Sequence, residues 1–345
     1  MAVRDVRVAA TRADVAKLAG VSASTVTYAL TGVRPISEAT RERVEAAMRE
    51  LNYSPNVMAR ALASNRSGLV AMLFPIRERG FNPSDFEYFR GASEVAQAAG
   101  FELLLSPMAL DDRGPLDQVV SRLVEGSLVM EVQYDDPRVD FLVQERRDFV
   151  LIGRTKDPEA LDFVDADFSD WGPMAIEHLA ALGHTVIGYV SQVQSLVDHG
   201  YGPLIRVETG MLEAAEKAGV TLHMRHVEAS VHAGRDAFNE LVELDSRVTA
   251  ILGFNELAVI GVLEGASALG WSVPGDLSLI QFGISDQGAK MTVPAQTTVS
   301  VDGYQIGARA MRYLLDRIEG KATGPQQHLA ETVLTDRGST AVSRR

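Results

Sequence analysis

The chain contains no cysteine among its 345 residues. Disulfide bonds, thiolate catalysis and cysteine-ligated metal sites are therefore excluded, which fits a reducing compartment. The N-terminal stretch MAVRDVRVAATRADV has no apolar run long enough for a signal peptide, and no later run is long enough to span a membrane. We therefore expect a cytoplasmic protein.

Recognised catalytic and metal-binding motifs are also missing. The sequence has no Gly-x-Ser-x-Gly elbow, no P-loop, no dinucleotide-binding glycine fingerprint and no HExxH helix. His178 and His184 are six residues apart, which does not place both on one helical face. His223 and His226 fall in an expected strand, where a spacing of three points them to opposite faces. We predict no enzyme activity, no metal site and no cofactor.

The charges are unevenly distributed. The formal net charge is −13, yet residues 1–66 carry ten Lys and Arg against six Asp and Glu, a net +4, and the remainder carries −17. A basic N-terminal part can contact phosphates, while the acidic body repels nonspecific DNA. With 46% hydrophobic residues, the chain is long enough for two or three domains with buried cores.

The N-terminal part begins with two short helical patterns. The first, Arg12 to Ala19, is expected to turn Val15, Ala16 and Leu18 inward and to end at Gly20, a residue that favours a left-handed turn. The second starts after Ser22, an N-cap whose hydroxyl can accept an amide proton near Thr25. Its apolar stripe consists of Val26, Ala29 and Leu30.

Two short helices joined by a tight glycine turn indicate a helix-turn-helix. A third helix from the N-cap Ser37 to about Leu51 closes the unit, with Val44, Ala47, Met48 and Leu51 at core spacing. Early residues of the second helix face outward and suit base edges in a major groove. We expect the DNA-binding residues of this unit to be Thr11, Ser22, Ala23, Ser24, Thr25, Thr27, Tyr28 and Arg34.

Residues 53–64, YSPNVMARALAS, form a separate candidate element. Pro55 can open a short helix, but its apolar surface is too small for it to fold alone. Such a segment orders when it packs on a partner or on DNA, and two copies side by side can insert Leu62 between base steps in the minor groove. The alternative is a plain linker. The DNA-binding residues expected here are Asn56, Ala59, Arg60 and Leu62.

The sequence DVAKLAGVSASTVTYAL, followed by ISEATRERVEAAMRELNYSPNVMARAL, resembles the headpiece and hinge of the LacI/GalR family of bacterial transcriptional regulators. The resemblance implies that Ala23, Ser24 and Tyr28 read operator bases and that Leu62 is the hinge wedge. The chain departs from the family at Thr27-Tyr28, where Ser-Arg is common. Tyrosine cannot make the bidentate guanine contact that arginine makes, so the resemblance does not give the operator bases.

From Gly68 onward the sequence alternates between strands and helices. The expected strands are LVAMLF, FELLL, SLVMEV, FVLI, VIGYV, TAILGF and LSLIQF, and the expected helices include FEYFRGASEVAQAAG, PLDQVVSRLVEG, WGPMAIEHLAALGH and ELAVIGVLEGASALG. Repeated strand-helix-strand units predict parallel sheets covered on both faces. The length favours two doubly wound lobes with a boundary near Asp162 to Asp167.

The resemblance implies that this α/β core has the periplasmic-binding-protein-like fold and that the chain crosses between its lobes three times. We expect a headpiece at 1–53, a hinge helix and linker at 54–67, and an effector-binding and dimerisation core at 68–345. The first lobe is expected at about 68–163 plus 296–324. The second lobe is expected at about 164–295 plus 325–345, so that His328 to Val333 lies in it.

Ligands of open parallel sheets bind beyond the carboxyl ends of the strands, so strand exits predict the lining of the cleft between the lobes. These exits include Ser106, Gln133 to Asp135, Ser191-Gln192, Asn255-Glu256 and Gly283 to Asp286. Together with the resemblance, they give the expected effector-binding residues: Pro75, Tyr134, Arg154, Phe168, Trp171, Arg206, Asn255 and Asp286.

Some of these assignments follow the family pattern and others depend on departures from it. The resemblance implies an effector contact for the amide of Asn255 and for Arg206, which lies one residue further from its helix glycine than in the family. Gly283 occupies the position of the family's sugar-binding aspartate, and Asp286 is the candidate substitute. Phe168 and Trp171 either wall the cleft or pack in the core.

We therefore expect a dimeric DNA-binding regulator, a repressor, that reads a pseudo-palindromic operator and responds to a small molecule, possibly a sugar, in the cleft. The sequence leaves tetramer formation open. Two alternatives remain: a regulator whose core binds a protein co-regulator, and a sugar-active enzyme fused to a DNA-binding head.

The substitution Leu62→Ala tests the hinge wedge. We expect it to weaken binding to a specific operator far more than binding to random duplex, because only the kinked specific complex uses the wedge. Fluorescence anisotropy with both DNAs measures the two affinities. Equal losses on both would count against the wedge.

Overall fold

The structure, a computed structural model, describes residues 10–31, 34–51, 53, 67–74, 82–107 and 124–344. These residues fall into two compact units. The first holds the described residues up to Leu69 together with Val124 and Glu125, and the second holds the rest. Within the described part, no helix is long and apolar enough to cross a membrane.

The first unit contains the helices α1 (Arg12–Ala19), α2 (Ala23–Thr31) and α3 (Glu38–Glu50). Their ends are fixed locally. Thr11 and Asp14 form a reciprocal capping box at the start of α1, and Gly20 ends that helix in the left-handed region at φ 64°. Ser22 Oγ accepts the Thr25 N–H at 3.1 Å, and Ser37 Oγ accepts the Thr40 N–H at 3.3 Å. The predicted N-caps are confirmed.

The core of this unit is small. It consists of Val15, Ala16, Ala19, Val26, Val44 and Ala47, with Ala29, Leu30, Met48 and Leu51 partly buried against it. The inward position predicted for Leu18 is wrong, because its side chain is 45% exposed. Residues four apart lie on one face of a helix, so Ala19 is buried on the same face as Val15 and Leu18 is not.

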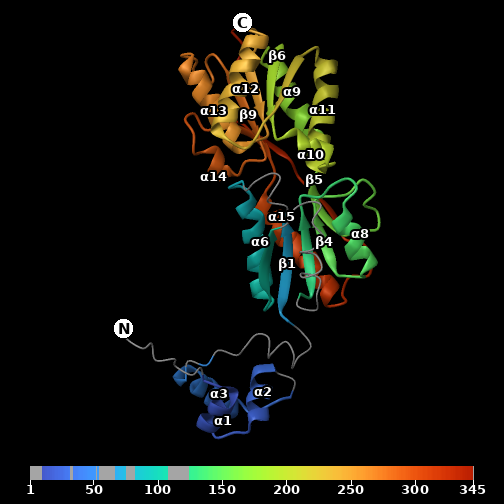
Figure 1. Ribbon diagram of the computed structural model, residues 1–345, viewed down its shortest axis with the longest axis vertical. Coiled ribbons are helices and arrows are strands. Elements are labelled where there is room, and N and C mark those ends of the chain that lie inside the picture. The colour runs from blue at the N-terminus through green and yellow to red at the C-terminus, as the bar shows by residue number, and fades with distance from the viewer. Residues whose placement is uncertain are drawn as a thin grey trace, which may run out of the picture. The chain divides into compact units, whose positions relative to one another are not determined.

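The first lobe of the second unit is a six-stranded sheet (Figure 1). Its strand order is β11 (Gln327–Ala330), β5 (Phe163–Ala166), β4 (Phe149–Ile152), β3 (Gly126–Met130), β1 (Leu69–Phe74) and β2 (Glu102–Pro107). The pairs β1–β3, β3–β4, β4–β5 and β5–β11 are parallel. The helices of this lobe among its described residues are α6 (Asp85–Ala98), α8 (Pro137–Gln144) and α15 (Gly303–Ile318).

The second lobe is another six-stranded sheet. Its strand order is β12 (Val333–Thr335), β10 (Thr297–Ser300), β9 (Ser278–Phe282), β8 (Ala250–Gly253), β6 (Val186–Ser191) and β7 (Thr221–His226). The pairs β7–β6, β6–β8, β8–β9 and β9–β10 are parallel, and β12 is antiparallel to β10. Its helical elements are the 3-10 turn η1 (Phe168–Asp170) and the helices α9 (Trp171–Ala181), α10 (Gln194–Asp198), α11 (Gly202–Ala218), α12 (Val231–Leu244), α13 (Glu256–Ala268) and α14 (Asp286–Ala289).

The chain passes between the lobes after β5, after β10 and after β11, which gives the three crossings that the resemblance implied. The positions differ from the expected boundaries at 296 and 325. β10 pairs with β9 and so belongs to the second lobe, whereas His328 pairs with Val164 in the first. The reason is that each crossing follows the end of a strand, and these short strands carry no distinct sequence signal. The predicted helix PLDQVVSRLVEG lies mostly outside the described residues.

Helix pairs in each lobe pack at very short range through glycine. A Cβ atom on Gly307 of α15 would lie 2.1 Å from the carbonyl oxygen of Tyr88 in α6. In the second lobe, a Cβ on Gly234 of α12 would lie 1.8 Å from the carbonyl oxygen of Ala258 in α13. Any larger side chain forces these helices apart.

We therefore expect Gly307→Ala to lower the free energy of unfolding of the core by roughly 1–3 kcal/mol, the usual cost of overpacking. Urea unfolding followed by circular dichroism measures it. Gly324→Ala is the matched control, because the added methyl there meets open space. Equal stability of the two variants would contradict the close helix packing.

Candidate functional site

The helix-turn-helix presents a polar face at the start of α2. Ala23 and Ser24 are exposed there, and Thr27 and Tyr28 are half-buried. Ser22 Oγ lies 2.7 Å from Ser24 Oγ and 2.8 Å from Thr25 Oγ1. These hydroxyls are thus ordered as a group at a helix N-terminus, where backbone N–H groups and hydroxyls suit a phosphate or a base edge.

The basic residues near this face are held by their neighbours. Arg12 Nη1 donates to Thr27 Oγ1 at 3.0 Å, and Thr27 Oγ1 donates to the carbonyl of Ala23 at 3.1 Å. The Arg34 guanidinium lies 6.0 Å from the centroid of the Tyr28 ring. Thr11 is exposed and caps α1. The structure thus brings Ser22, Ser24 and Thr25 together at the start of α2 and places Arg34 near Tyr28, whereas Thr11 contacts Asp14 at the start of α1. The hinge residues Asn56, Ala59, Arg60 and Leu62 lie outside the described residues.

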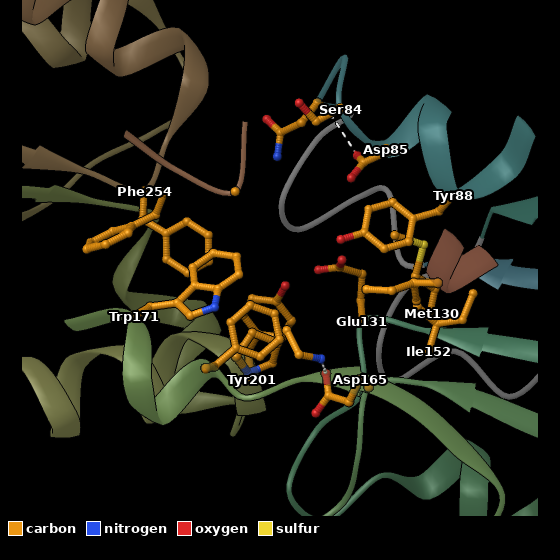
Figure 2. Close-up of a pocket in the computed structure, with 18 of the residues that line it drawn as sticks. Ser84, Asp85, Tyr88, Met130, Glu131, Ile152, Asp165, Trp171, Tyr201 and Phe254 are labelled. Carbon is orange, nitrogen blue, oxygen red and sulfur yellow. Dashed lines mark hydrogen bonds between the residues drawn. The ribbon is translucent and has the colours of Figure 1, made fainter. Parts of the chain in front are cut away.

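A pocket lies where the carboxyl ends of the two sheets meet (Figure 2). The residues at the strand ends that line it are Met130 and Glu131 at the end of β3, Ile152 and Gly153 at the end of β4, Asp165 and Ala166 of β5, Gln192 after β6, Phe254 after β8, and Phe282 and Gly283 at the end of β9. This arrangement follows the rule that open parallel sheets bind ligands beyond their strand ends.

The second lobe supplies an aromatic wall to the pocket. The Trp171 ring centroid lies 4.5 Å from that of Phe168, 5.8 Å from Phe254 and 6.1 Å from Phe282. Trp171 is fully buried and its Nε1 donates to Thr332 Oγ1 at 3.0 Å, which fixes the indole plane. Aromatic rings in tilted contact form a rigid apolar surface against which a ring can stack. Phe168 and Trp171 therefore line the pocket and also pack in the core of the second lobe, so the two expected alternatives coincide.

Gly283 explains one departure from the family pattern. Its φ is 70°, and a Cβ there would lie 3.3 Å from Phe254 and 3.4 Å from Trp171. An aspartate at this position would be strained and would crowd the aromatic wall. The residue proposed as its substitute, Asp286, is exposed and pairs with Lys290 and with Arg337 at 2.8 Å. It does not line the pocket.

The first lobe supplies a buried carboxylate to the pocket. Asp165 Oδ2 lies 3.5 Å from Arg154 Nε and 4.0 Å from Arg206 Nη1. Neither Asp165 Oδ2 nor Arg206 Nη1 has a hydrogen-bond partner, although both are buried. Burial raises the pKa of Asp165 to about 6, and the two arginines only partly oppose this effect. Burial likewise lowers the pKa of Arg206. Such unsatisfied buried groups are usual at binding sites.

Of the other predicted effector residues, Arg154 and Arg206 lie beside this carboxylate, and neither they nor Tyr134 and Asn255 line the pocket. Arg154 donates to Asp167 Oδ1 at 3.0 Å, and Arg206 donates to the backbone carbonyls of Arg154 and Thr155. The Arg206 guanidinium stacks on the Tyr134 ring at 4.8 Å. Asn255 caps α13 and donates to the carbonyl of Val227 at 3.3 Å. Pro75 lies outside the described residues.

Glu131 is a pocket residue that the predicted set did not include. Its backbone is left-handed, at φ 58°, which is costly for a side chain of this kind. The buried Arg138 holds it: its guanidinium donates to the carbonyls of Met130 and Glu131 at 3.1 and 2.9 Å and pairs with Asp136. Figure 2 shows Glu131 directed into the space between the lobes. The aspartate-arginine pair thus positions a carboxylate in the pocket.

Gln281 and Tyr201 also line the pocket and were missed. Gln281 stands inside the apolar strand run LSLIQF and is fully buried. A buried polar residue in such a run was the available signal, because it needs a hydrogen-bond partner. Tyr201 carried no signal, since only the tertiary fold brings it beside Gln133.

The described residues include no group of three or more His, Cys, Asp or Glu side chains able to hold a metal ion. The four histidines considered above have protein partners. His178 contacts Thr340, His184 contacts Thr249 and the carbonyl of Ala341, and His223 and His226 contact Asp245 and Glu208.

Comparison with known proteins identifies the relatives of both units. Residues 11–56 match the family described as Bacterial regulatory proteins, lacI family, and residues 176–340 match the Periplasmic binding protein-like domain. The chain is 29% identical over 342 residues to the HTH-type transcriptional repressor CytR of Escherichia coli (strain K12), with 96% of each chain covered. It is 28% identical over 321 residues to the HTH-type transcriptional repressor PurR of Photobacterium profundum, with 90% of this chain and 93% of that one covered.

Two solved structures extend the similarity. One is a complex of the transcriptional regulator CelR with cellobiose, at 26% identity and a TM-score of 0.69, covering 96% of this chain and 99% of that one. The other is the lac repressor dimer bound to operator and the anti-inducer ONPF, at 21% identity and a TM-score of 0.79, with the same coverage. At 21% identity, the similarity to the lac repressor shows a shared fold.

The raised pKa of Asp165 leads to a prediction about stability. The folded protein binds this proton more tightly than the unfolded chain, whose aspartate pKa is near 3.8. The stabilising contribution is therefore complete below about pH 4 and is lost as the pH rises through about 6. We expect Asp165→Asn to raise the free energy of unfolding relative to the wild type near pH 7.5, by at most about 3 kcal/mol, with no gain near pH 4.

Urea titrations at both pH values measure this difference. Asp286→Asn is the control of opposite sign, because Lys290 and Arg337 lower the pKa of that exposed carboxyl. It should therefore reduce stability at neutral pH. A loss of stability in Asp165→Asn that is the same at both pH values would refute the assignment.

Proposed function

The chain belongs to the LacI family of bacterial regulatory proteins, and on that premise we propose that it is a transcriptional repressor that binds an operator through the helix-turn-helix face and an effector in the lobe pocket. The observation that carries the proposal is the ordered polar face at the start of α2, present in the same chain as a pocket with unsatisfied buried polar groups. A ligand-controlled regulator needs a DNA-binding element and an effector-binding pocket in the same protein.

On the DNA side, Ala23, Ser24 and Tyr28 contact base edges in the major groove, and Thr27 and Arg34 support them. The residues 54–67 act as the hinge and linker, with Leu62 as the wedge in the minor groove. A tyrosine at position 28 can donate one hydrogen bond or pack on a thymine methyl, but it cannot grip guanine as arginine does. The operator is therefore expected to differ from those read through a family arginine.

The repressor acts as a homodimer on a pseudo-palindromic operator. A surface on the first lobe supports this. The edge strand β2 exposes Leu104 and Leu105, at 44% and 47% of their surface, and α6 exposes Phe86 at 58%. Exposed apolar side chains on an edge strand are commonly covered by another chain, here a second copy.

The effector is a sugar or a related metabolite with hydroxyl groups. Asp165 lines the pocket and its Oδ2 has no hydrogen-bond partner, so a ligand hydroxyl can donate to this carboxylate. Polyol rings also stack their apolar faces on aromatic side chains such as Trp171. The cellobiose complex of CelR supports this class of ligand.

Ligand binding is coupled to DNA binding through movement of the lobes. Contacts between the lobes lie at the pocket mouth: Gln133 pairs with Tyr201, the Tyr134 N–H donates to the Gly200 carbonyl at 2.8 Å, and the Ser285 N–H donates to Ser84 Oγ at 2.7 Å. A ligand that touches both lobes changes the relative stability of their arrangements. That change shifts the first lobes of the dimer against each other and alters how the two hinge segments pair.

We propose no catalytic activity for this pocket. The relatives are regulators, and the buried groups of the pocket suit hydrogen bonding to a bound ring. A repressor acts where the chromosome lies, so we place the protein in the cytoplasm. If the core bound a protein co-regulator instead of a small molecule, sugars and polyols would not shift the melting temperature of the protein.

The base-reading role is tested with the site that the full-length protein selects from a random duplex library. We expect Tyr28→Ala to weaken binding to that site by about tenfold or more, because a lost base contact costs about 1–3 kcal/mol, and to leave binding to random duplex nearly unchanged. Glu45→Ala, on the exposed side of α3, is the control and should bind like the wild type. Failure of the wild type to select any site would refute the proposed function.

A further inference from the structure

An arginine from the first helix of the headpiece contacts the second helix. Arg12 is the first residue of α1, and its Nη1 donates to Thr27 Oγ1 of α2 at 3.0 Å. The Thr27 hydroxyl in turn donates its own proton to the carbonyl of Ala23 at 3.1 Å. Because that proton is already used, the hydroxyl oxygen meets Arg12 as an acceptor, and the guanidinium is fixed beside the polar face of α2.

The stability of α1 does not explain an arginine at position 12. A cation in the first turn of a helix is unfavourable, because the N-terminal end of the helix dipole is positive. Within the part of the chain that the structure describes, the Arg12 side chain pairs with no carboxylate, and its hydrogen bond to Thr27 is exposed. A single exposed hydrogen bond contributes little to stability. The other N–H donors of this guanidinium are therefore available to a ligand.

The place of the guanidinium on the headpiece indicates what this ligand is. Ala23 and Thr27 are four residues apart, so they lie on one face of α2, beside the base-reading side chains of the proposed function. Those side chains offer few donors: Ala23 has none, and Ser24 and Tyr28 have one hydroxyl each. None of the three can bind guanine through two parallel hydrogen bonds, which is the contact that arginine makes with O6 and N7. Arg12 supplies such a side chain from α1.

We propose that Arg12 reads a guanine in the major groove of the operator and that Thr27 positions its guanidinium for this contact. The inference rests on the proposed function and deepens it, because it adds a base and a specificity-determining residue outside α2. The planar guanidinium donates to O6 and N7 of the guanine. A phosphate contact needs a cation but no fixed plane, whereas the hydrogen bond to Thr27 fixes the plane.

The substitution Arg12→Lys tests the proposal, because it keeps the charge and removes the planar pair of donors. The full-length protein is given the site that the wild type selects from a random duplex library, and copies of that site with single G·C pairs changed to A·T in both half-sites. Fluorescence anisotropy at one fixed salt concentration measures each affinity. We expect one such change to weaken wild-type binding about tenfold or more.

The variant should lose this one preference. We expect Arg12→Lys to bind the unchanged site about tenfold more weakly than the wild type does, and to distinguish it from the changed site by less than about twofold. Binding to random duplex should stay within about twofold of the wild type, because lysine retains the attraction to phosphates. Replacing that guanine with 7-deazaguanine, which lacks the N7 acceptor, should weaken wild-type binding and leave binding by the variant nearly unchanged.

Arg43→Lys is the matched control. Arg43 is also an exposed arginine that donates to a threonine hydroxyl, Thr40 Oγ1, but it lies on α3. This variant should keep every base preference of the wild type. Thr27→Val removes the acceptor of Arg12 and should reduce the preference for the same guanine. Equal melting temperatures of the wild type and Arg12→Lys would show that the headpiece remains folded.

The proposal is overturned if Arg12→Lys retains the preference for that guanine, as it would if Arg12 only contacted a phosphate or only joined α1 to α2. It is also overturned if no G·C change weakens binding by the wild type. In both cases the proposed function stands, because the wild type has selected a site. If the wild type selects no site, the proposed function fails and this inference fails with it. An unchanged preference in Thr27→Val would refute the positioning role of Thr27.

Discussion

The core of this protein depends on one geometric constraint: the carboxyl ends of two parallel sheets face each other across three chain crossings. Parallel strands place the loops that follow them at one edge of the sheet, so residues far apart in sequence meet there. Asp165, Gln192, Phe254 and Gln281 come from four strands and line one pocket because of it. The crossings also allow a ligand that contacts both sheets to affect the arrangement of the lobes.

The pocket is kept at a cost in stability. A buried carboxylate with a raised pKa, two glutamines with unsatisfied oxygens and a glutamate in a left-handed backbone all oppose folding. The surrounding structure compensates for this cost through well-packed aromatic rings and the buried Asp136–Arg138 pair. Such unfavourable groups are retained where a ligand completes them, and binding then stabilises the folded protein by mass action.

The headpiece is stabilised in a different way from the core. Its core contains six buried side chains, all alanine or valine, so local capping at Thr11, Ser22 and Ser37 contributes a large share of its order. Its basic charge favours DNA, while the acidic remainder of the chain does not. Because the DNA-binding headpiece and the effector-binding core are separate, the headpiece can be basic while the core is acidic.

The sequence by itself determined the elements whose causes are local. The caps and Gly20 defined the helix-turn-helix, because they act within one turn, and the long apolar runs defined the strands from LVAMLF to LSLIQF. The tertiary structure alone decided which lobe takes β10 and β11, since short strands carry no signal of their partners. It also decided which polar groups face the pocket. Asp286 and Asn255 have partners elsewhere, and Gln281 and Glu131 line it, because side-chain direction at a strand end depends on what packs around it.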